Sequence, residues 1–361
     1  MKTVIYGSQG IALGAFKAIE TVFSDTHIDC FLVTKKEKNA SILGGLPVRE
    51  LDEYVSTLSE KEKSEVLVLL GVPENVMGVI EESLDFAGLF NHVRLDSERW
   101  AEMQEAAYRK TRQYIPLSLY ACGNKKPILN VYKIVHEKDK PFAADHDDDP
   151  EYMKTLQVGA AISSIFIAEI KDNVGDNISE KNGNYSELTG LYWIWKNQIN
   201  ISSIQSVDYY GLAHYRRFLN LTDDDLTRLT FNDIDVVLPY PMSYEPNIEA
   251  HHLRYLSNIE WNAVLLALKE LHPECAKVFK DILKQGYLYN YNVVLAKTSV
   301  LNDYCRWLFP ILFRVEQIVN PDGRKKANRY IGYIGETLET LYFMSNKDRL
   351  KIAHSCCRFL I

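Results

Sequence analysis

Basic side chains that could hold a diphosphate follow one another in the segment VDYYGLAHYRRFL, residues 207–219. Its apolar beginning predicts a buried strand that emerges at His214, and Arg216 and Arg217 come directly afterwards. Two arginines at a strand end can bind a diphosphate through bidentate hydrogen bonds, although a basic surface turn has the same pattern. Because neighbouring residues of an extended segment point to opposite faces, we expect Arg216 to face the site with His214 and Arg217 to support stability.

Two glutamates lie in segments that otherwise read as apolar helices. Glu187 belongs to the segment 177–197 and Glu336 to RYIGYIGETLETLYF, residues 329–343. A carboxylate in such surroundings is costly to bury unless it is paired or functional. Both are candidates for the base that takes a proton from a hydroxyl group, and Asp176, in the loop before the first segment, is the third candidate. A buried and satisfied polar residue is the structural alternative.

Apolar and aromatic residues recur every three or four positions at Tyr185, Leu188, Tyr192 and Trp195, the stripe of a helix that faces the core. Aromatic platforms beside carboxylates also hold sugars. The adjacent His251 and His252 point in different directions on any regular element, so at most one reaches a shared site. Further ligands for a metal ion are not recognisable, so these histidines predict no metal site.

The elements that must position these residues fall into two domains of an α/β fold. Apolar runs at 3–6, 28–33, 65–70 and 92–95 read as strands, and 11–23, 51–63 and 75–87 read as helices. This alternation predicts a parallel, Rossmann-like sheet. We expect a Rossmann-like domain over residues 1–96, a helical linker over 97–127, and a second domain over 128–361 that opens with a strand at 128–135.

Three glycines of the first domain, Gly7, Gly10 and Gly14, lie where a strand turns into a helix N-terminus, which is a natural anion site. Their spacing is not that of the dinucleotide fingerprint. Thr34 ends the second strand where an acidic ribose ligand would be expected, so the sequence argues against NAD binding.

Charge and composition exclude several classes of protein. The net charge of −7 disfavours a nucleic-acid partner. The apolar start of the chain is too short for a secretory signal, and no apolar run is long enough to cross a membrane. The cysteines show no metal-ligand spacing, so we expect reduced thiols and a cytoplasmic protein. The mixed basic and apolar segment 347–361 predicts either a weak contact with an anionic membrane surface or a last element of the domain.

Four long segments of the second domain occur in the order typical of one family: NYSELTGLYWIWKN, YYGLAHYRRFL, YNVVLAKTSVLNDYCRWLFPIL and RYIGYIGETL. From about residue 128 onward the chain resembles a family of capsular and O-antigen polysaccharide glycosyltransferases of GT-A-like fold, grouped with galactofuranosyltransferases. The chain departs from the family at Glu137-Lys138, at Val293 and at Thr337, which stands where an arginine usually follows the glutamate. The segments GSQGIALG, ILGGLPVREL and LVLLGVPENV resemble the small Rossmann-like domain of bacterial sugar acyltransferases.

The resemblance implies transfer of a sugar, galactofuranose from UDP-galactofuranose, with inversion, to a capsular or O-antigen acceptor. The acceptor would be a lipid-linked glycan at the inner membrane face. The strand end that usually carries metal-binding carboxylates has His214 and Arg216 instead, which favours a reaction without a metal ion. Asp235 keeps Mg²⁺ or Mn²⁺ as the alternative. Three other functions stay open: a non-catalytic scaffold of a polysaccharide complex, an enzyme that modifies nucleotide sugars through the first domain, and an enzyme that has lost activity and no longer binds donor.

The resemblance also implies roles for individual residues. Both Glu187 and Glu336 should approach a cleft beside His214 and Asn292, one as the base or acceptor ligand and the other orienting the donor sugar. Donor binding is assigned to the polar residues His136, Asn177, Thr189, His214, Arg216, Arg217 and Asn292. Acceptor binding is assigned to Tyr192, Trp193, His251 and His252.

Overall fold

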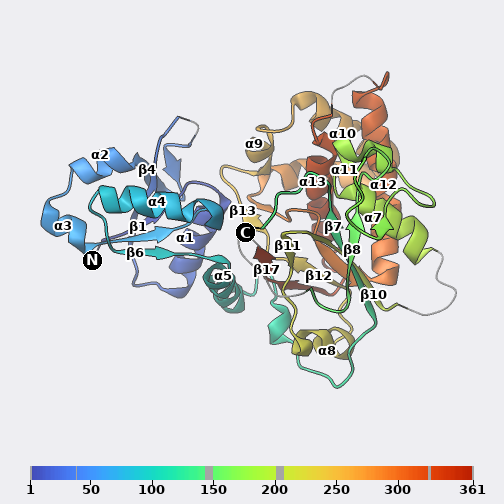
Figure 1. Cartoon of the computed structure of the whole chain (residues 1–361), viewed down its shortest axis with the longest axis horizontal. Helices are drawn as coiled ribbons and strands as arrows, with labels where there is room; N and C mark the ends of the chain where they lie inside the picture. The colour runs from blue at the N-terminus through green and yellow to red at the C-terminus, as the bar shows by residue number, and fades with distance from the viewer. Residues whose placement is uncertain (1, 38, 143–148, 201–206, 324–326, 360–361) are drawn as a thin grey trace. The chain divides into compact units, whose positions relative to one another are not determined.

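The computed structural model describes residues 2–37, 39–142, 149–200, 207–323 and 327–359. The chain forms two compact units, each with its own sheet (Figure 1). The first comprises Met1–Tyr114 and Met242–Glu245, and the second comprises Ile115–Pro241 and Pro246–Leu360. We describe each unit by itself.

The first unit contains a mainly parallel sheet in the strand order β3-β4-β2-β1-β5-β6. All neighbouring strands run parallel except β3, which forms an antiparallel hairpin with β4. The strands are β1 (Lys2–Tyr6), β2 (Ile28–Val33), β3 (Ile42–Leu43), β4 (Leu46–Glu50), β5 (Val66–Leu70) and β6 (His92–Arg94). The prediction of a Rossmann-like parallel sheet is confirmed.

Five helices accompany this sheet: α1 (Gly10–Val22), α2 (Leu51–Ser56), α3 (Glu60–Glu65), α4 (Glu74–Phe86) and α5 (Ser97–Thr111). The single helix predicted over 51–63 is wrong, because Ser59 and Glu62 form a capping box that starts a new helix. Helix α5, which was expected in a linker, belongs to the first unit. It packs so closely on α1 that a Cβ on Gly14 would lie 2.3 Å from the Trp100 ring.

The glycines at the start of α1 are explained by packing. Gly7 has φ +127°, and a Cβ there would lie 2.5 Å from the carbonyl oxygen of Gly71. A Cβ on Gly10 would lie 3.0 Å from Met242 Cε, in the segment that the chain returns to this unit. The expected anion site at this helix N-terminus is therefore not needed to account for these residues.

The second unit is built on a mixed nine-stranded sheet. Its central order is β16-β12-β15-β10-β7-β8-β9, and β11 pairs with both β10 and β17. Strands β10, β7, β8 and β9 are parallel, whereas β15 is antiparallel to β10 and to β12. The strands are β7 (Leu129–Val135), β8 (Met153–Gln157), β9 (Ile170–Lys171), β10 (Tyr209–His214), β11 (Arg217–Leu219), β12 (Val236–Pro239), β15 (Val294–Lys297), β16 (Ile352–Ser355) and β17 (Cys357–Phe359).

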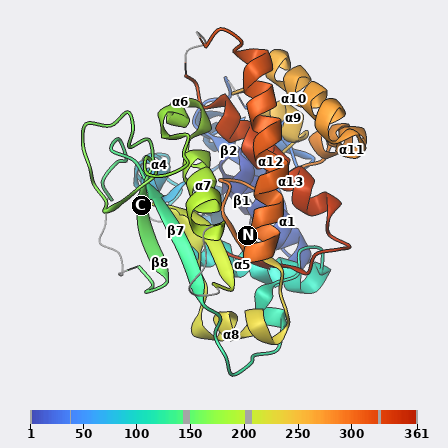
Figure 2. The same ribbon diagram turned by 90° about the vertical axis from the view of Figure 1, so that its right-hand side faces the viewer.

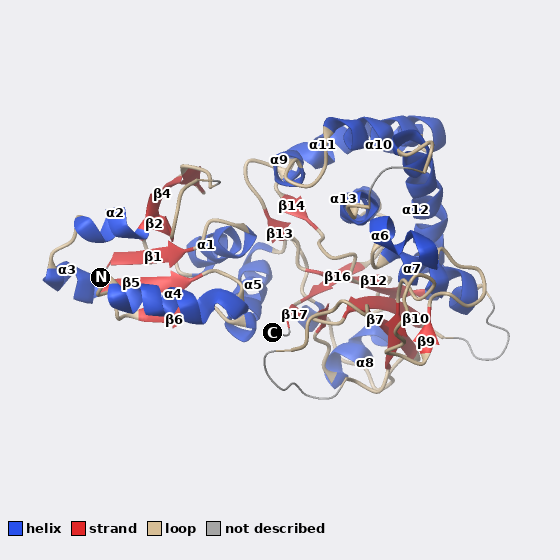
Figure 3. Cartoon of the chain, turned by 45° about the horizontal axis from the view of Figure 1, so that its top comes forward, coloured by secondary structure: helices blue, strands red, loops and turns tan. Residues whose placement is uncertain are grey.

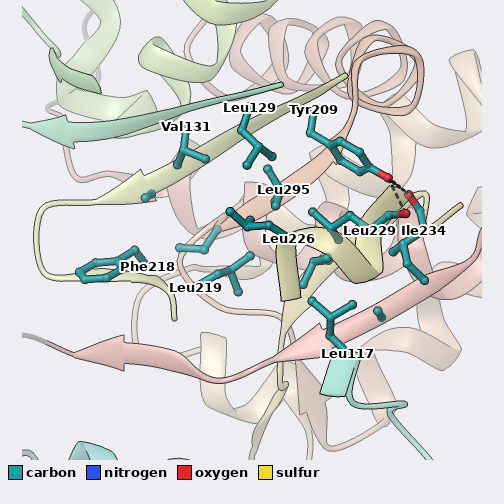
Figure 4. Close-up of a cluster of buried hydrophobic side chains, with 14 residues drawn as sticks. Leu117, Leu129, Val131, Tyr209, Phe218, Leu219, Leu226, Leu229, Ile234 and Leu295 are labelled. Atoms are coloured by element: carbon teal, nitrogen blue, oxygen red, sulfur yellow. Dashed lines mark hydrogen bonds between the residues drawn. The ribbon is translucent and has the colours of Figure 1, made fainter. Parts of the chain in front are cut away.

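Helices cover both faces of this sheet (Figures 2 and 3). On one face, α7 (Leu188–Ile194) approaches β7 so closely that a Cβ on Gly190 would lie 2.5 Å from Ile134 Cδ1. The long helix α12 (Thr298–Val319) lies beside it (Figure 2). On the other face, α8 (Asp223–Phe231) packs on a core that includes Leu129, Val131 and Leu229 (Figure 4).

The second unit contains five more helices, three short helical turns and one short strand within the described residues. The helices are α6 (Asn182–Tyr185), α9 (Ile248–His252), α10 (Asn258–Leu271), α11 (Pro273–Lys284) and α13 (Tyr330–Ser345), with 3₁₀ turns at Leu117–Leu119 and Ser179–Lys181 and a π-helical turn at Trp195–Ile199. This unit has one further two-residue strand, β14 (Tyr287–Leu288), whereas β13 (Met242–Ser243) belongs to the first unit.

The C-terminal segment forms part of the second sheet. Strand β16 pairs in parallel with β12, and β17 pairs with β11. Ala353 is fully buried and His354 is 5% exposed. Of the two interpretations of the segment 347–361, the structure therefore supports a last element that completes the domain. Within the described residues, no helix is long and apolar enough to cross a membrane.

Candidate active site

The candidate site lies at the carboxyl end of the central strand β10. His214 is the last residue of β10, and its register partner in the antiparallel strand β11 is Arg217. The two residues between them therefore form the turn of a tight hairpin. Arg216 occupies this turn, so the chain is not extended there and the expected alternation of faces does not apply.

The structure places the two arginines differently from this expectation. Arg216 donates hydrogen bonds to the carbonyl oxygens of Lys140 and Pro141, at 2.9 and 2.6 Å, which ties one loop to another. The guanidinium of Arg217 lies 4.3 Å from the centre of the Tyr291 ring and 5.7 Å from that of Phe359. Arg217, and not Arg216, is the arginine of the hairpin that faces the carboxylates described next.

A turn before β15 connects the polar residues that the sequence analysis singled out. Asn292 donates from Nδ2 to Glu187 Oε1 at 2.6 Å, and the Tyr291 amide donates to Glu336 Oε1 at 2.9 Å. The Tyr291 carbonyl accepts a bond of 2.6 Å from His214 Nε2. We call these five residues the carboxylate cluster. The structure thus brings together Glu187, Glu336, His214 and Asn292, which lie far apart in the sequence.

The backbone of this turn is strained. Tyr291 and Asn292 have φ of +72° and +51°, a region that residues other than glycine rarely occupy. Ser186, directly before Glu187, has φ +50°, and Arg329, at the start of α13, has φ +63°. Such conformations persist only where surrounding structure imposes them, and they gather at functional sites. Here they aim the backbone groups of Tyr291 and the side chain of Asn292 at the two glutamates.

The surroundings of the cluster set its protonation. Burial, together with the nearby Glu187 carboxylate, raises the pKa of Glu336 to about 8. Burial also lowers the pKa of His214, which keeps its ring neutral. Because the acceptor is a carbonyl oxygen, the ring proton of His214 lies on Nε2. At neutral pH Glu336 therefore carries a proton, and His214 carries no charge.

Arg329 completes the electrostatic surroundings, although the sequence analysis did not single it out. Its Nε donates to Ser186 Oγ at 3.0 Å, and its positive charge counteracts the rise in the pKa of Glu336. Arg217 acts on the pKa of Glu336 in the same direction. Two guanidinium groups therefore lie close enough to the carboxylate cluster to influence it. The only signal in the sequence was the position of Arg329 at the start of the last family motif.

A family model described as a domain of unknown function, DUF4422, matches residues 130–347, which is more than half of the chain. The chain belongs to the DUF4422 family. Among curated proteins no sequence matches it. The whole carboxylate cluster lies within the matched residues of the DUF4422 domain.

A solved structure similar to this chain is that of the bifunctional glycosyltransferase WbbM in its apo form. The two share 27% sequence identity with a TM-score of 0.53, over 64% of this chain and 45% of WbbM. This chain thus spans less than half the length of WbbM. The likeness supports the prediction of a GT-A-like mixed α/β fold for the second unit, which is confirmed.

Two fungal structures are more distant. The mannosyltransferase Ktr4p from S. cerevisiae has a TM-score of 0.25 and 11% identity, over 60% of this chain and 68% of its own. Core-mannan synthase A from Aspergillus fumigatus, in its Mn/GDP form, has a TM-score of 0.22 and 11% identity, over 98% of this chain and 72% of its own. Scores this low do not establish a shared fold.

Within the DUF4422 domain, His252 lies behind Glu336. Its ring is fully buried, with Nε2 3.9 Å from Glu336 Oε2, and its Nδ1 shares a hydrogen bond of 3.0 Å with the Thr337 hydroxyl. Burial lowers the pKa of His252 to about 3, so it is neutral and not an ion-pair partner. The ring of His251 packs 5.8 Å from that of Tyr255 instead. Only one of the two histidines reaches the cluster, and Thr337 is explained as its hydrogen-bond partner.

Several predicted site residues lie elsewhere. Asp176 accepts a hydrogen bond of 3.0 Å from the Tyr192 hydroxyl, which places it outside the cluster. Tyr192 and Trp193 are only 8% and 7% exposed, and the Trp193 indole donates to the carbonyl of Val174. Their rings lie in the core, and their assignment to acceptor binding stays a prediction.

Two donor-binding candidates, one in the loop before α6 and one in α7, have hydrogen bonds to nearby backbone groups. Asn177 spans a turn, donating to the carbonyl of Gly175 and accepting from the amide of Ser179. Thr189 is fully buried and donates to the carbonyl of Ser186. Neither side chain has a hydrogen bond to the cluster within the described residues, and their assignment to donor binding stays a prediction.

His136 lies one residue beyond β7, beside the end of β10. Its backbone amide donates to Asp139 Oδ2 at 2.7 Å, and its Nδ1 accepts from the amide of Lys138 at 3.1 Å. Burial raises the pKa of Asp139, whereas His136, His214 and Arg216 lower it. His136 is therefore near the hairpin but fixed in a turn of its own.

A divalent metal ion would need several oxygen or nitrogen ligands in one place. Among the described residues, no group of three or more His, Cys, Asp or Glu side chains could hold one. Asp235, the alternative raised from the sequence, is paired with Lys297 Nζ at 2.8 Å and accepts from the amide of Lys351 at 2.8 Å. Asp235 is thus engaged in structure, and we assign no residue to a metal ion.

Proposed function

We propose that this chain is a glycosyltransferase that moves a sugar from a nucleotide-sugar donor to a hydroxyl group of a glycan acceptor. The observation that carries the proposal is the carboxylate cluster at the end of β10, two glutamates held by one strained turn. The likeness of this chain to the glycosyltransferase WbbM supports it. Transfer requires a base for the acceptor, a group that orients the donor and positive charge for the leaving diphosphate.

The two glutamates divide these tasks because their surroundings differ. Glu187 makes one hydrogen bond, from Asn292, and its other oxygen has no donor within the described part of the chain. We assign Glu187 as the base that removes the acceptor hydroxyl proton. Glu336 carries a proton at neutral pH and can donate a hydrogen bond to the donor sugar. His214 fixes the carbonyl of Tyr291 and so acts as a positioning residue.

The leaving diphosphate would be neutralised by Arg217 and Arg329. Arg217 is held against the Tyr291 ring, and its buried Nε has no hydrogen-bond partner among the described residues. Arg329 is exposed and is tied through its Nε to Ser186. A diphosphate lying between these side chains would offer acceptor oxygens to both guanidinium groups. This arrangement supplies positive charge without requiring Mg²⁺ or Mn²⁺.

The identity of the substrates rests on the resemblance of the sequence motifs alone. We propose UDP-galactofuranose as the donor, with inversion at the donor carbon, and a lipid-linked capsular or O-antigen glycan at the inner membrane face as the acceptor. Inversion fits one base and no covalent sugar intermediate. The resemblance of the first unit to acyltransferase domains stays a prediction.

A ligand screen tests the proposal. The purified chain would be heated with UDP-, GDP- and dTDP-sugars, with and without Mg²⁺ or Mn²⁺, and its melting temperature recorded. We expect stabilisation by one nucleotide class, in the absence of divalent ions, which Arg217→Ala removes and Arg216→Ala preserves. Stabilisation by none of these donors would contradict the proposal, and stabilisation only with a divalent ion would contradict the arginine site.

A further inference from the structure

A loop that follows β8 presents an unusual run of apolar side chains to solvent. Within residues 159–169, Ile162, Ile165, Phe166 and Ile167 are 59%, 57%, 60% and 49% exposed. Single exposed apolar residues are normal on protein surfaces, but several in one short segment mark an interaction site. This loop has no role in the proposed transfer reaction.

The loop is held in place from within, so the display of these side chains is built into the fold. Gln157 is fully buried, and its side chain donates to the carbonyl of Ile165 at 2.7 Å and accepts from the amide of Ile167 at 2.8 Å. The Ser163 hydroxyl donates to Glu137 Oε2 at 2.6 Å. With these polar groups paired inside the unit, the outward side of the loop consists largely of hydrocarbon.

The position and charge of the loop indicate which kind of surface it binds. The Lys171 ammonium lies 5.1 Å from the centre of the Phe166 ring, so a cation accompanies the apolar side chains, although the exposed Glu169 at the end of the loop carries the opposite charge. Through Ser163 and Glu137 the loop is bonded to the end of β7, beside β10, whose end carries the carboxylate cluster. An apolar surface with a flanking lysine suits the boundary between lipid headgroups and acyl chains.

We propose that this loop docks the chain on a lipid bilayer, with Ile165 and Phe166 inserted at the level of the headgroups and Lys171 beside lipids of net negative charge. A protein partner is the competing occupant. Protein hot spots are enriched in Trp, Tyr and Arg, with polar groups around them. The four residues of this loop are aliphatic or Phe, which favours lipid.

The test is sedimentation of the full chain with vesicles of phosphatidylethanolamine and phosphatidylglycerol. We expect the wild type to bind, and the double substitution Ile165→Ser with Phe166→Ser to lower the partition coefficient at least about tenfold. The matched control is the double variant Phe231→Ser with Ile259→Ser. These two side chains lie on α8 and α10 and are 64% and 67% exposed, and this variant should bind the vesicles like the wild type. Lys171→Gln should weaken binding to these vesicles but not to vesicles of phosphatidylcholine alone.

Two results would overturn the proposal. One is equal partitioning of the wild type and the Ser double variant. The other is a dimer of the wild type, in the absence of lipid, that the double variant dissociates, because the loop would then be a protein interface. A second variant tests the proposal in case the Ser double variant misfolds. In Phe166→Trp, the tryptophan fluorescence should shift to shorter wavelength when vesicles are added, and an unchanged spectrum argues against insertion. None of these measurements depends on sugar transfer, so failure here would leave the proposed function untouched.

Discussion

Glu336→Gln replaces a buried carboxyl group by an amide of the same shape that cannot ionise. The Gln oxygen can still accept the hydrogen bond from the Tyr291 amide, so the turn before β15 should be preserved. In the wild type, the pKa of Glu336 is raised from 4.5 to about 8, first by burial and then by Glu187. The substitution removes the titration and little else.

The sign and size of the effect follow from this pKa. Between about pH 4.5 and 8 the folded chain keeps a proton that the unfolded chain loses, so the stability of the wild type falls as pH rises. The slope is about 1.4 kcal/mol per pH unit. Glu336→Gln should therefore be more stable than the wild type by about 3 kcal/mol at pH 7 and about 5 kcal/mol above pH 8.

Tryptophan fluorescence during urea unfolding at pH 5 to 9 measures this difference. Four of the five tryptophans lie in the second unit, so the signal reports mainly on the unit that holds Glu336. Glu274→Gln, whose side chain is 69% exposed, is the control and should follow the wild type at every pH. If Glu336→Gln and the wild type showed parallel stability curves, the assignment of a buried, protonated Glu336 would be refuted.

Three further predictions concern other parts of the chain. Arg217→Ala should weaken UDP binding about 10- to 100-fold in calorimetry, the value of charged hydrogen bonds, whereas Arg216→Ala should change it less than about twofold. A larger loss of UDP binding for Arg216→Ala than for Arg217→Ala would instead support the expectation from the sequence, in which Arg216 binds the donor. Deleting residues 352–359 should unfold the second unit, as seen by loss of near-ultraviolet circular dichroism, and a folded product would contradict the sheet position of this segment. Gly14→Ala should destabilise the first unit by about 1–3 kcal/mol, because its methyl group would collide with Trp100; unchanged urea unfolding would disprove the close packing.

The sequence predicted the regular elements well where periodicity was strong. The strand predicted over 28–33 is β2, and the helix over 75–87 differs from α4 by one residue at each end. The helix over 51–63 was wrong although its signal was visible, since Ser59 and Glu62 have the spacing of a capping box. Apolar periodicity continued across the break and concealed it.

The candidate site was predictable in part. Glu187, Glu336 and Asn292 were recognisable as polar residues in apolar patterns, and the structure joins them. The hairpin at Arg216 was not, because no glycine or asparagine marks the turn and only the pairing of His214 with Arg217 creates it. Tyr291 contributes to the site through its backbone, which has a left-handed conformation, and through its ring. No sequence pattern predicts this conformation.

The central claim is that Glu187 is the base of a glycosyl transfer, and one comparison tests it most directly. The wild type and Glu187→Gln would be assayed for sugar transfer from the donor that the ligand screen identifies, with donor affinity measured on the same samples. We predict that turnover falls by about 10²- to 10⁴-fold, the contribution of general-base catalysis, while the Kd of the donor changes less than about twofold. Unchanged turnover, or a loss of donor binding that accounts for the whole decrease, would contradict this account.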